Sequence, residues 1–399
     1  MKILVLNCGS SSIKYKLYNM EDHSVMAAGG IERVGMPESF NLVKLPGGEK
    51  RKLMRDIPEH TTGVKFIFEC LTDPEIGAIK DLKEITAVGH RLVHGGEKFN
   101  KSVLITDEVI RQMEACNDLA PLHNPANLKG VAAVTELMPD LPQVGVFDTA
   151  FHQTMPDYAY MYALPYELYD KYTIRRYGFH GTSHRYVSAR ACEFLGVDAS
   201  QKKVITCHIG NGGSLAAVLN GKCLDTSMGL TPLEGLMMGT RSGDVDGGAL
   251  TFIQEKLGLD SAGLSNLLNK KSGLLGITGL SSDMRDVYAA SQEGNKKAQL
   301  ALAMYHYRIK KYIGAYAAAM GGVDILVFTA GVGENQTSVR EAVCENMEFL
   351  GIKLDKEKNS QIHGEEAILS TPDSKVTVVC IPTDEELVIA KDTLALTNS

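Results

Sequence analysis

The stretches ILVLNCGSSSIKYKLYN at residues 3–19 and VITCHIGNGGSLAAVLN at residues 204–220 share one pattern. Each begins with an apolar run, passes through a glycine and three small or polar residues, and ends in a second strand-like run. Gly9 of the first stretch matches Gly210 of the second. Two strands joined by a short turn of small residues are typical of a β-hairpin. The repeated pattern therefore predicts two duplicated halves, each with such a hairpin.

The turns of the two predicted hairpins carry groups that suit phosphate. Backbone N–H groups exposed in a glycine- and serine-rich turn bind anions well. We expect both turns to point into a cleft between the two halves. Two unrelated hairpins with solvated turns are the alternative, which would be preferred if no other segment indicated phosphate chemistry.

Other segments indicate that both halves are α/β. Three apolar runs are typical of buried strands that end in loops: residues 85–89, 143–147 and 324–329. Residues 125–138 and 297–320 have helical patterns, and Pro125 suits the start of a helix. A last helix is predicted over about 384–396, with Thr383 as its N-cap.

The length of the chain suits two domains, since 399 residues can bury two substantial cores. We place the first domain at residues 1–150 plus about 385–399, because the last helix is expected to return to it. The second domain is then residues 151–384.

Charge and apolar pattern exclude several classes of protein. A net charge of −7 does not indicate the excess of positive charge that is typical of nucleic-acid-binding proteins. No apolar run approaches the roughly 18 residues of a membrane span, and the N-terminal apolar run is too short for a signal peptide. The eight cysteines are scattered without a C-x-x-C pair, which indicates reduced thiols. We expect a cytoplasmic protein with neither nucleic acid nor membrane as partner.

Two glycine-rich segments suit phosphate, although the P-loop and protein-kinase strings are missing. Segment 7–14 (NCGSSSIK) adds Asn7 as an oxygen ligand and Lys14 as a cation to a run of serines, which taken alone is more often an ordinary turn. Segment 330–335 (AGVGEN) follows a predicted strand, and a glycine-rich strand-to-helix turn suits nucleotide phosphates or adenosine.

Arginine and histidine stand among glycines in three further segments. Arg91, in GHRLVHGG at 89–96, has a guanidinium that matches a carboxylate or phosphate bidentately. The glycines favour a loop there, and the lack of H-E-x-x-H argues against zinc. Arg241 lies in MMGTRSGDVD, and His180 in GFHGTSH precedes a predicted helix. Taken singly, Arg91 could instead form a surface salt bridge, and His180 could be an ordinary histidine of the core.

Taken together, these strings resemble the acetate/propionate kinase family. The matching strings are N-x-G-S-S-S-x-K at 7–14, G-H-R-x-V-H-G-G at 89–96, F-H-G-T-S-H at 179–184, G-T-R-S-G-D at 239–244, G-V-G-E-N at 331–335 and T-x-E-E-L at 383–387. The resemblance implies an α/β fold of two duplicated ribonuclease-H-like domains of the actin/hexokinase/Hsp70 type, with an interdomain cleft. It implies a homodimer that phosphorylates acetate reversibly with ATP and Mg²⁺, for which Mn²⁺ can substitute.

The resemblance also implies roles for single residues. Arg91 and Arg241 would bind the acetate carboxylate and then the transition-state charge. His180 would donate a hydrogen bond to the phosphoryl group, with His123 nearby, and Asp148 would be the catalytic acidic residue.

Three groups of binding residues follow from the same resemblance. The metal ligands would be Asn7 and Glu385. The pocket for the methyl group would be formed by Val93, Leu122, Phe179 and Pro232. The nucleotide would be bound by Ser10, Ser12, Lys14, His208, Ile209, Gly210, Asn211, Gly212, Asp283, Met284, Arg285, Gly331, Val332, Gly333, Glu334 and Asn335. The chain departs from the family at Asp384, where Asn is common, and at Gly247, where Pro is common.

The chemistry explains why cations are needed. A carboxylate with a pKa of about 4 to 5 is already an anion at neutral pH and needs no base. Its repulsion from the γ-phosphate must be overcome instead, which calls for arginines and Mg²⁺. We therefore expect Asp148 to orient an arginine or metal-bound water. A propionate kinase, a sugar-type kinase and a chaperone-like ATPase of the same superfold are the alternatives.

Overall fold

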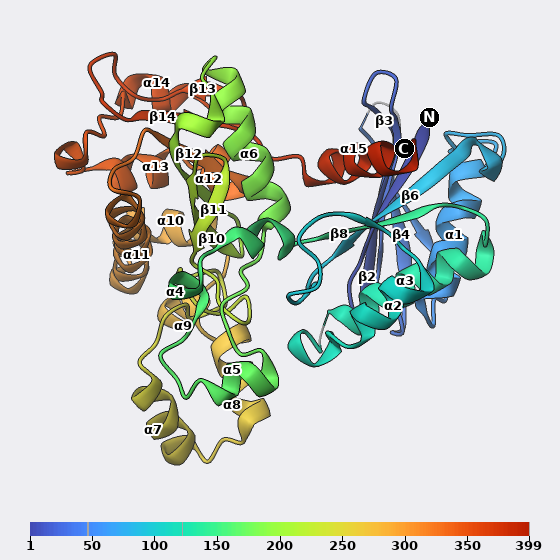
Figure 1. Ribbon diagram of the computed structural model, residues 1–399, viewed down its shortest axis with the longest axis horizontal. Helices are drawn as coiled ribbons and strands as arrows, with labels where there is room; N and C mark the ends of the chain where they lie inside the picture. The colour runs from blue at the N-terminus through green and yellow to red at the C-terminus, as the bar shows by residue number, and fades with distance from the viewer. Residues whose placement is uncertain (46–47, 122, 399) are drawn as a thin grey trace. The chain divides into compact units, whose positions relative to one another are not determined.

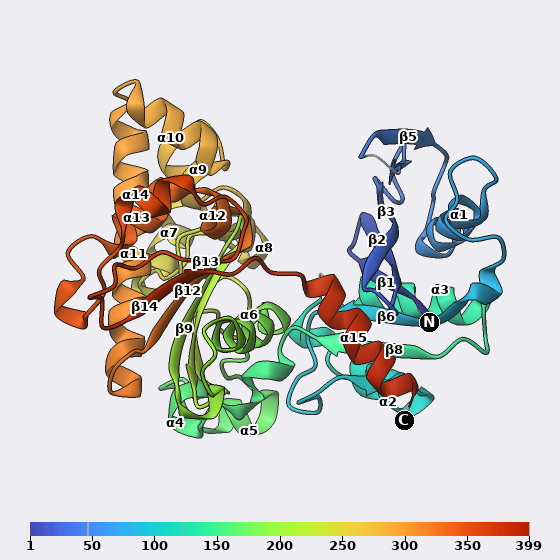
Figure 2. The same cartoon turned by 90° about the horizontal axis from the view of Figure 1, so that it is seen from above.

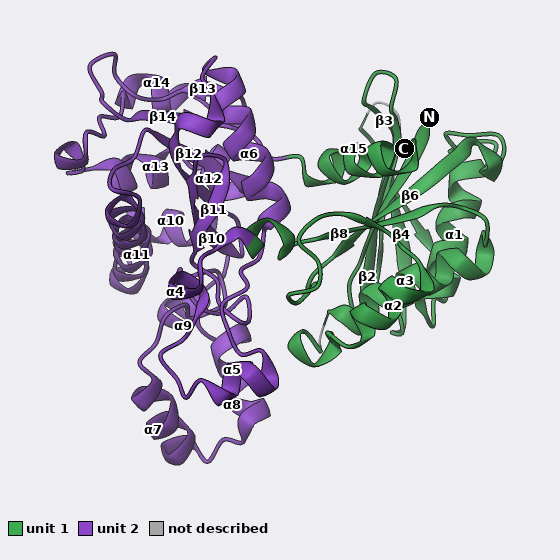
Figure 3. Cartoon of the chain, in the orientation of Figure 1, with its two compact units in different colours: residues 1–153, 384–399 green, residues 154–383 purple. Residues whose placement is uncertain are grey.

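The computed structural model describes residues 1–45, 48–121 and 123–398. The chain divides into two compact units, shown separately coloured in Figure 3. Unit 1 is Met1–Gln153 with Asp384–Ser399, and unit 2 is Thr154–Thr383. The unit boundaries lie within a few residues of the predicted domain boundaries at 150 and 385.

Unit 1 is a mixed sheet with strand order β5-β4-β3-β2-β1-β6-β8-β7, in which β1, β6 and β8 are parallel. Its strands are β1 (Lys2–Cys8), β2 (Ser12–Asn19), β3 (Ser24–Glu32), β4 (Phe40–Lys44), β5 (Lys50–Met54), β6 (Ile85–Leu92), β7 (Val103–Leu104) and β8 (Gln143–Phe147). Its α-helices are α1 (His60–Thr72), α2 (Asp107–Glu114), α3 (Asn124–Leu137) and α15 (Glu385–Thr397).

Both faces of this sheet are buried, because alternate side chains of β1 pack into two different cores. Leu4 and Leu6 share a core with residues of α1 and α3. Ile3 and Val5 share a separate core with Ile389 and other residues of α15. Successive side chains of a strand point to opposite faces, so a continuous apolar run is what a strand covered on both sides requires. Figures 1 and 2 show α15 on one face and α1 with α3 on the other.

Unit 2 is a second mixed sheet, with strand order β11-β10-β9-β12-β14-β13. Its strands are β9 (Lys203–Ile209), β10 (Gly213–Leu219), β11 (Lys222–Thr226), β12 (Ile325–Thr329), β13 (Ala367–Ile368) and β14 (Thr377–Cys380). Its α-helices are α4 (Asp157–Tyr160), α5 (Glu167–Tyr172), α6 (Gly181–Phe194), α7 (Gly247–Leu257), α8 (Ser261–Lys270), α9 (Gly273–Thr278), α10 (Met284–Gln292), α11 (Lys296–Met320), α12 (Ala330–Asn335), α13 (Thr337–Cys344) and α14 (Lys356–Gln361).

Strand β9 shows the same two-sided burial as β1. Ile205 and Cys207 lie in the core that includes α11. Thr206 and His208 hydrogen-bond to residues of α6, His184 at 2.7 Å and Ser183 at 2.8 Å. The sheet of unit 2 therefore lies between α11 and α6.

The two predicted hairpins are confirmed. Strand β1 pairs antiparallel with β2 up to Cys8↔Ile13, and β9 pairs antiparallel with β10 up to Ile209↔Gly213. The predicted strands at 85–89, 143–147 and 324–329 and the three predicted helices are also present. Pro125 lies in the first turn of α3.

Two local predictions were wrong. Gly89 is part of β6, which continues to Leu92, and does not begin a loop. A Cβ on Gly89 would lie 2.4 Å from Thr393 Oγ1 of α15, so this glycine permits close helix packing. The N-cap of α15 is Asp384, which accepts from the N–H of Leu387 at 3.1 Å, and not Thr383. The N–H of Thr383 is instead donated to Glu334 at 3.0 Å.

The side chains of all eight cysteines are buried, and none of these cysteines is joined in a disulfide. Across the described ranges, no helix combines the length and the apolar character needed to cross a membrane.

Candidate active site

The first group of predicted residues meets at one edge of the sheet of unit 1. Strands β6 and β8 are parallel neighbours, with Leu92 opposite Phe147. Arg91 lies next to the end of β6, and Asp148 directly follows β8, where its N–H is donated to the carbonyl of Leu92 at 2.9 Å. The carboxyl ends of parallel strands meet at the same edge, so the register brings these two side chains together.

Arg91 and Asp148 form a bidentate ion pair. Nε of Arg91 donates to Oδ1 at 3.1 Å, and Nη2 donates to Oδ2 at 2.8 Å. The Asp148 side chain is 2% exposed and that of Arg91 is 28% exposed. The negative charge of Asp148 raises the pKa of Arg91 above its usual value. A buried carboxylate needs such a partner, and Asp148 is thereby engaged with the guanidinium.

Glu385 brings a further carboxylate to the same part of unit 1. Burial, followed by the negative charges of Asp148, Glu386 and Asp384, raises the pKa of Glu385 to about 7, and Arg91 opposes the shift. Its position is fixed because it is the first residue of α15. A cation bound beside this carboxylate would relieve the repulsion.

Asn7 and Glu385 are suitable ligands for a hard cation. Neither side chain has a hydrogen-bond partner in the described part of the chain, so their oxygen atoms remain available to a ligand. Within residues 1–45, 48–121 and 123–398 there is no group of three or more His, Cys, Asp or Glu side chains placed to hold a metal ion. Mg²⁺ does not require one, since it is usually held by one or two carboxylates together with substrate phosphates and water.

The hairpin turn of unit 1 has the expected form. The N–H of Gly9 is donated to the carbonyl of Ser12 at 2.8 Å, and Asn7 lies opposite Lys14 in the ladder. Asn7 and Lys14 line a pocket of about 130 Å³. Ser10 is exposed at the turn and lies outside that lining.

The remaining predicted residues of unit 1 lie next to these strands. Val93 directly follows β6, and its N–H is donated to Oδ1 of Asn127 at 3.0 Å. His123 is the N-cap residue of α3. Leu122 lies outside the described residues.

Unit 2 contains a larger pocket, of about 540 Å³. Eight of the predicted nucleotide-binding residues line it: Gly210, Asn211, Asp283, Met284, Arg285, Gly331, Val332 and Asn335. Five further lining residues were not predicted: Gly239, Leu274, Ser282, Tyr305 and Gln336. The G-T-R-S-G-D string could have indicated Gly239, whereas Tyr305 lies within the long helix α11 and gives no local signal.

Other residues predicted to bind nucleotide shape this pocket without lining it. Ile209 is fully buried in the core. Glu334 turns inward, and Oε1 accepts from the N–H groups of Ala330 at 2.7 Å and Thr383 at 3.0 Å. This carboxylate therefore holds the turn between β12 and α12 in place. Gly333 is buried within the same turn.

Arg241, His180 and Gly212 meet beside the hairpin turn of unit 2. A Cβ on Gly212 would lie 3.3 Å from Nη1 of Arg241 and 3.9 Å from Cε1 of His180. His180 is the N-cap residue of α6 and has a left-handed backbone, with φ of 57°. Phe179, directly before it, is 3% exposed. The close approach explains why a glycine follows Asn211.

Arg241 differs electrostatically from Arg91. Burial lowers the pKa of Arg241, and no carboxylate of the described residues pairs with it. Nη1 of Arg241 donates to the carbonyl of Pro232 at 3.1 Å and contacts Sδ of Met238 at 3.8 Å. A half-buried cation without counter-charge is costly unless an anion binds to it. Arg241 is therefore a strong candidate for binding an anionic substrate.

The orientation of His180 is set by neighbouring polar groups. Its Nδ1 lies 2.9 Å from Oγ of Ser214, and the same hydroxyl lies 2.8 Å from Nε2 of His184. The His180 ring stacks on that of His208, with centroids 4.1 Å apart. These contacts fix the ring next to Gly212.

The chain is similar to known proteins over nearly its whole length. A family model described as the acetokinase family matches residues 2–391. The chain is 70% identical over 394 residues to acetate kinase of Bacteroides thetaiotaomicron, with 99% of each chain covered. It matches the crystal structure of Porphyromonas gingivalis acetate kinase with a TM-score of 0.97, 62% identity and 99% of each chain covered. A propionate kinase from Francisella tularensis matches with a TM-score of 0.92 and 42% identity, again over 99% of each chain.

Proposed function

The chain belongs to the acetokinase family, and we propose that it transfers a phosphoryl group reversibly between ATP and acetate by direct in-line displacement. The observation that carries this proposal is the half-buried Arg241, which has no carboxylate partner in the described residues and lies against the Gly212 turn. The 70% identity to an acetate kinase, against 42% to a propionate kinase, supports acetate as the preferred acid.

The reaction needs positioning and charge rather than a base. A carboxylate oxygen of acetate attacks the γ-phosphorus, the bond to the β,γ-bridging oxygen breaks, and ADP leaves with the electron pair. Acetate is already deprotonated at neutral pH, so no proton has to be removed. The main barrier is the approach of two anions, which cationic groups lower by stabilising the charge of the transition state.

Each charged residue has a distinct role in this proposal. Arg91, held in one orientation by Asp148, binds the carboxylate through the part of the guanidinium that faces away from the ion pair. Arg241 neutralises charge that develops on the transferred group, and His180 donates a hydrogen bond to it. His123, the N-cap residue of α3, would lie near the transferred phosphoryl group.

Asn7 and Glu385 would hold Mg²⁺. When bound, the cation would neutralise phosphate charge. Lys14, which lies opposite Asn7 in the hairpin, adds a second positive charge. The serine turn at Ser10 and Ser12 offers hydroxyls and N–H groups to phosphate oxygens.

The pocket of unit 2 would hold the nucleotide. Its volume of about 540 Å³ is within the range of roughly 300–1,000 Å³ that small ligands occupy. The hairpin residues Asn211 and Gly212 would contact phosphates, and Gly331 with Asn335 would contact the adenosine. Arg285 and Asp283 form a bidentate pair at the rim, with Nε–Oδ1 at 3.0 Å and Nη2–Oδ2 at 2.6 Å.

The acid is selected by size. The apolar residues predicted for this role, Val93, Phe179 and Pro232, would contact its methyl group. One extra methylene in a tight apolar pocket costs roughly 1–3 kcal/mol. Acetate is therefore expected to be a better substrate than propionate, and butyrate a poor one.

We further propose that the protein is a cytoplasmic homodimer. Large apolar side chains of unit 2, those of Tyr158, Tyr166, Phe252 and Leu257, are 60–81% exposed. Exposed aromatic and aliphatic groups of this kind are typical of protein interfaces. Light scattering coupled to size-exclusion chromatography measures the mass, and a monomer at micromolar concentration would contradict the dimer.

A substrate panel tests the proposed function. ADP release is measured with ATP, Mg²⁺ and one acceptor at a time: acetate, propionate, butyrate or glucose. The highest kcat/KM is expected for acetate. Higher values for propionate would make the chain a propionate kinase. Release that needs no acid would favour a chaperone-like ATPase, and release that needs glucose would favour a sugar kinase.

A further inference from the structure

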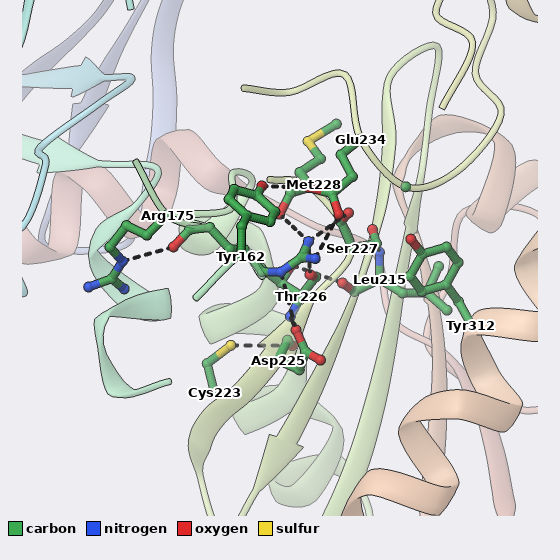
Figure 4. A network of polar contacts seen from close by, with 12 residues as sticks. Tyr162, Arg175, Leu215, Cys223, Asp225, Thr226, Ser227, Met228, Glu234 and Tyr312 are labelled. Carbon is green, nitrogen blue, oxygen red and sulfur yellow. Dashed lines mark hydrogen bonds and ion pairs between the residues drawn. The ribbon is translucent and has the colours of Figure 1, made fainter. Parts of the chain in front are cut away.

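Arg176 lies at the centre of a polar network in unit 2, outside the predicted site. Nη1 of Arg176 donates to three successive carbonyls, and Nη2 donates to Oε1 of Glu234 at 2.7 Å. The three carbonyls are those of Thr226 at 3.0 Å, Ser227 at 3.2 Å and Met228 at 3.0 Å. These acceptors belong to the end of β11 and to the loop that follows it (Figure 4). One guanidinium therefore connects the first and last parts of residues 226–234.

Tyr162 holds the middle of this loop. Its hydroxyl donates to Oε2 of Glu234 at 2.6 Å and accepts from the N–H of Leu230 at 2.9 Å. The carbonyl of Gly229 accepts from the N–H groups of Tyr177 at 3.2 Å and Gly178 at 3.1 Å. Figure 4 shows Tyr162 and Glu234 side by side in this network. The loop is thus fixed along its length.

The loop contains the residue that orients Arg241. Pro232 lies two residues before Glu234, and its carbonyl accepts from Nη1 of Arg241 at 3.1 Å. Proline fixes φ at this point, which removes one of the two backbone rotations that could reorient its carbonyl within the loop. No ion pair among the described residues holds Arg241, which makes this carbonyl its main directional contact.

We propose that Arg176 is a positioning residue for substrate binding, acting through the loop 226–234 and the Pro232 carbonyl to orient Arg241. This inference rests on the proposed function, since it assigns the anionic substrate to Arg241. Arg176 does not line the nucleotide pocket of about 540 Å³, and we assign its effect on the reaction to the orientation of Arg241.

An arginine is required at this position for physical reasons. The guanidinium presents five donors in a planar fork, which allows one side chain to hold several carbonyls and a carboxylate at once. Its side chain is only 16% exposed, and Asp225 lies 3.7 Å from Nε as a second negative partner. Lysine would keep the charge between Glu234 and Asp225 but would lose most of the carbonyl contacts.

Arg176→Lys is therefore the main test, with Arg190→Lys as the matched control. Arg190 is another arginine of unit 2 with two carboxylate partners, Glu366 and Glu193, and it lies outside the proposed site. We expect Arg176→Lys to lower kcat/KM for acetate by about 10- to 100-fold, since small misplacements of a catalytic group have effects of that size. The KM for ATP should change by less than about twofold. Arg190→Lys should leave both constants unchanged.

Tyr162→Phe is the second variant, in case Arg176→Lys does not fold. This variant lacks the hydroxyl that bonds Glu234 and the N–H of Leu230. We expect it to lower kcat/KM for acetate by about three- to tenfold, with the KM for ATP again unchanged. Two outcomes would overturn the inference. One is an equal loss of kcat/KM for acetate and for ATP, because a purely structural residue would affect both substrates alike. The other is wild-type kinetics in both variants.

A double-mutant cycle separates this inference from the proposed function. In an Arg241→Lys background, Arg176→Lys should reduce kcat/KM for acetate by less than about threefold, because the guanidinium that Arg176 helps to orient is already absent. A full additive loss would overturn the positioning role. Wild-type kinetics of Arg241→Lys alone would instead show that the proposed function of Arg241 is wrong.

Discussion

Arg91 and Asp148 are joined by two parallel hydrogen bonds of 3.1 and 2.8 Å, and the side chain of Asp148 is almost completely buried. A carboxylate engaged in this way cannot also act as a base toward a substrate proton. Its effect on the reaction must pass through the orientation and charge of the guanidinium. The pair therefore favours electrostatic positioning over acid–base catalysis.

Asp148→Asn tests that conclusion. The amide nitrogen would face a donor of Arg91, so one of the two parallel bonds is replaced by a repulsive contact. We expect kcat to fall by about 100-fold with little change in the KM for ATP. Adding Arg91→Ala to this variant should cause little further loss. Independent, additive losses in steady-state kinetics would contradict a shared role.

Glu385→Gln tests the metal site. Removal of the charge should raise the Mg²⁺ concentration needed for half-maximal activity by about tenfold or more. Glu108→Gln is the control, because Glu108 is an exposed carboxylate of α2 that forms an ion pair with Arg111 at 2.7 Å. Identical Mg²⁺ titrations of wild type and Glu385→Gln would place the metal elsewhere.

Gly247→Pro tests the departure from the family at this position. Gly247 is the first residue of α7, its N-cap Asp246 has φ of −57° and ψ of 129°, and a Cβ at Gly247 would meet no atom within 4 Å. Proline is favoured at the first position of a helix. The variant should increase the free energy of unfolding by about 0.4–1 kcal/mol, as measured by urea denaturation. A loss of stability would show that the glycine is required.

His90 should make stability depend on pH. Burial lowers the pKa of His90 to about 4 in the folded state, while its Nε2 lies 2.7 Å from Oε1 of Gln143. The unfolded state, with a pKa of about 6.5, therefore takes up the proton first as pH falls. The stability contribution is complete above pH 6.5 and is lost toward pH 4, by up to about 3 kcal/mol.

His90→Gln is the variant for this prediction. The difference in unfolding free energy between wild type and variant should change with pH in this window, as measured by denaturation at several pH values. His306, whose pKa burial also lowers to about 4, acts in the same direction and is present in both proteins. A difference that does not vary between pH 7 and pH 4 would contradict the assignment.

The sequence predicted the elements whose signals are local. Glycine at positions 9 and 210 between apolar runs was sufficient for both hairpins, because a short turn and strand periodicity are read from neighbouring residues. Asp148 was expected to orient an arginine or metal-bound water, but its pairing with Arg91 depends on the parallel register of β6 and β8. Long-range register of this kind has no signal within either segment.

Features set by distant contacts were missed. The strand was predicted to end at Gly89 because glycines favour a loop, whereas the need for a glycine there comes from α15, about 300 residues later in the chain. Thr383 was predicted as the N-cap of the last helix, but its N–H is donated to Glu334, and Asp384 is the N-cap. Arg176 carries no signal in the sequence, because its contacts are mainly with carbonyl groups, which every residue possesses. Such contacts become visible only in the folded structure.

The most direct test of the central claim is to trap the product with hydroxylamine. The protein is incubated with ATP, Mg²⁺ and acetate, and acyl hydroxamate is measured against ADP in the same reaction. The proposed phosphoryl transfer to a carboxylate predicts one acetyl hydroxamate for each ADP, with none in the absence of acetate. Release of ADP at a full rate without hydroxamate would contradict it.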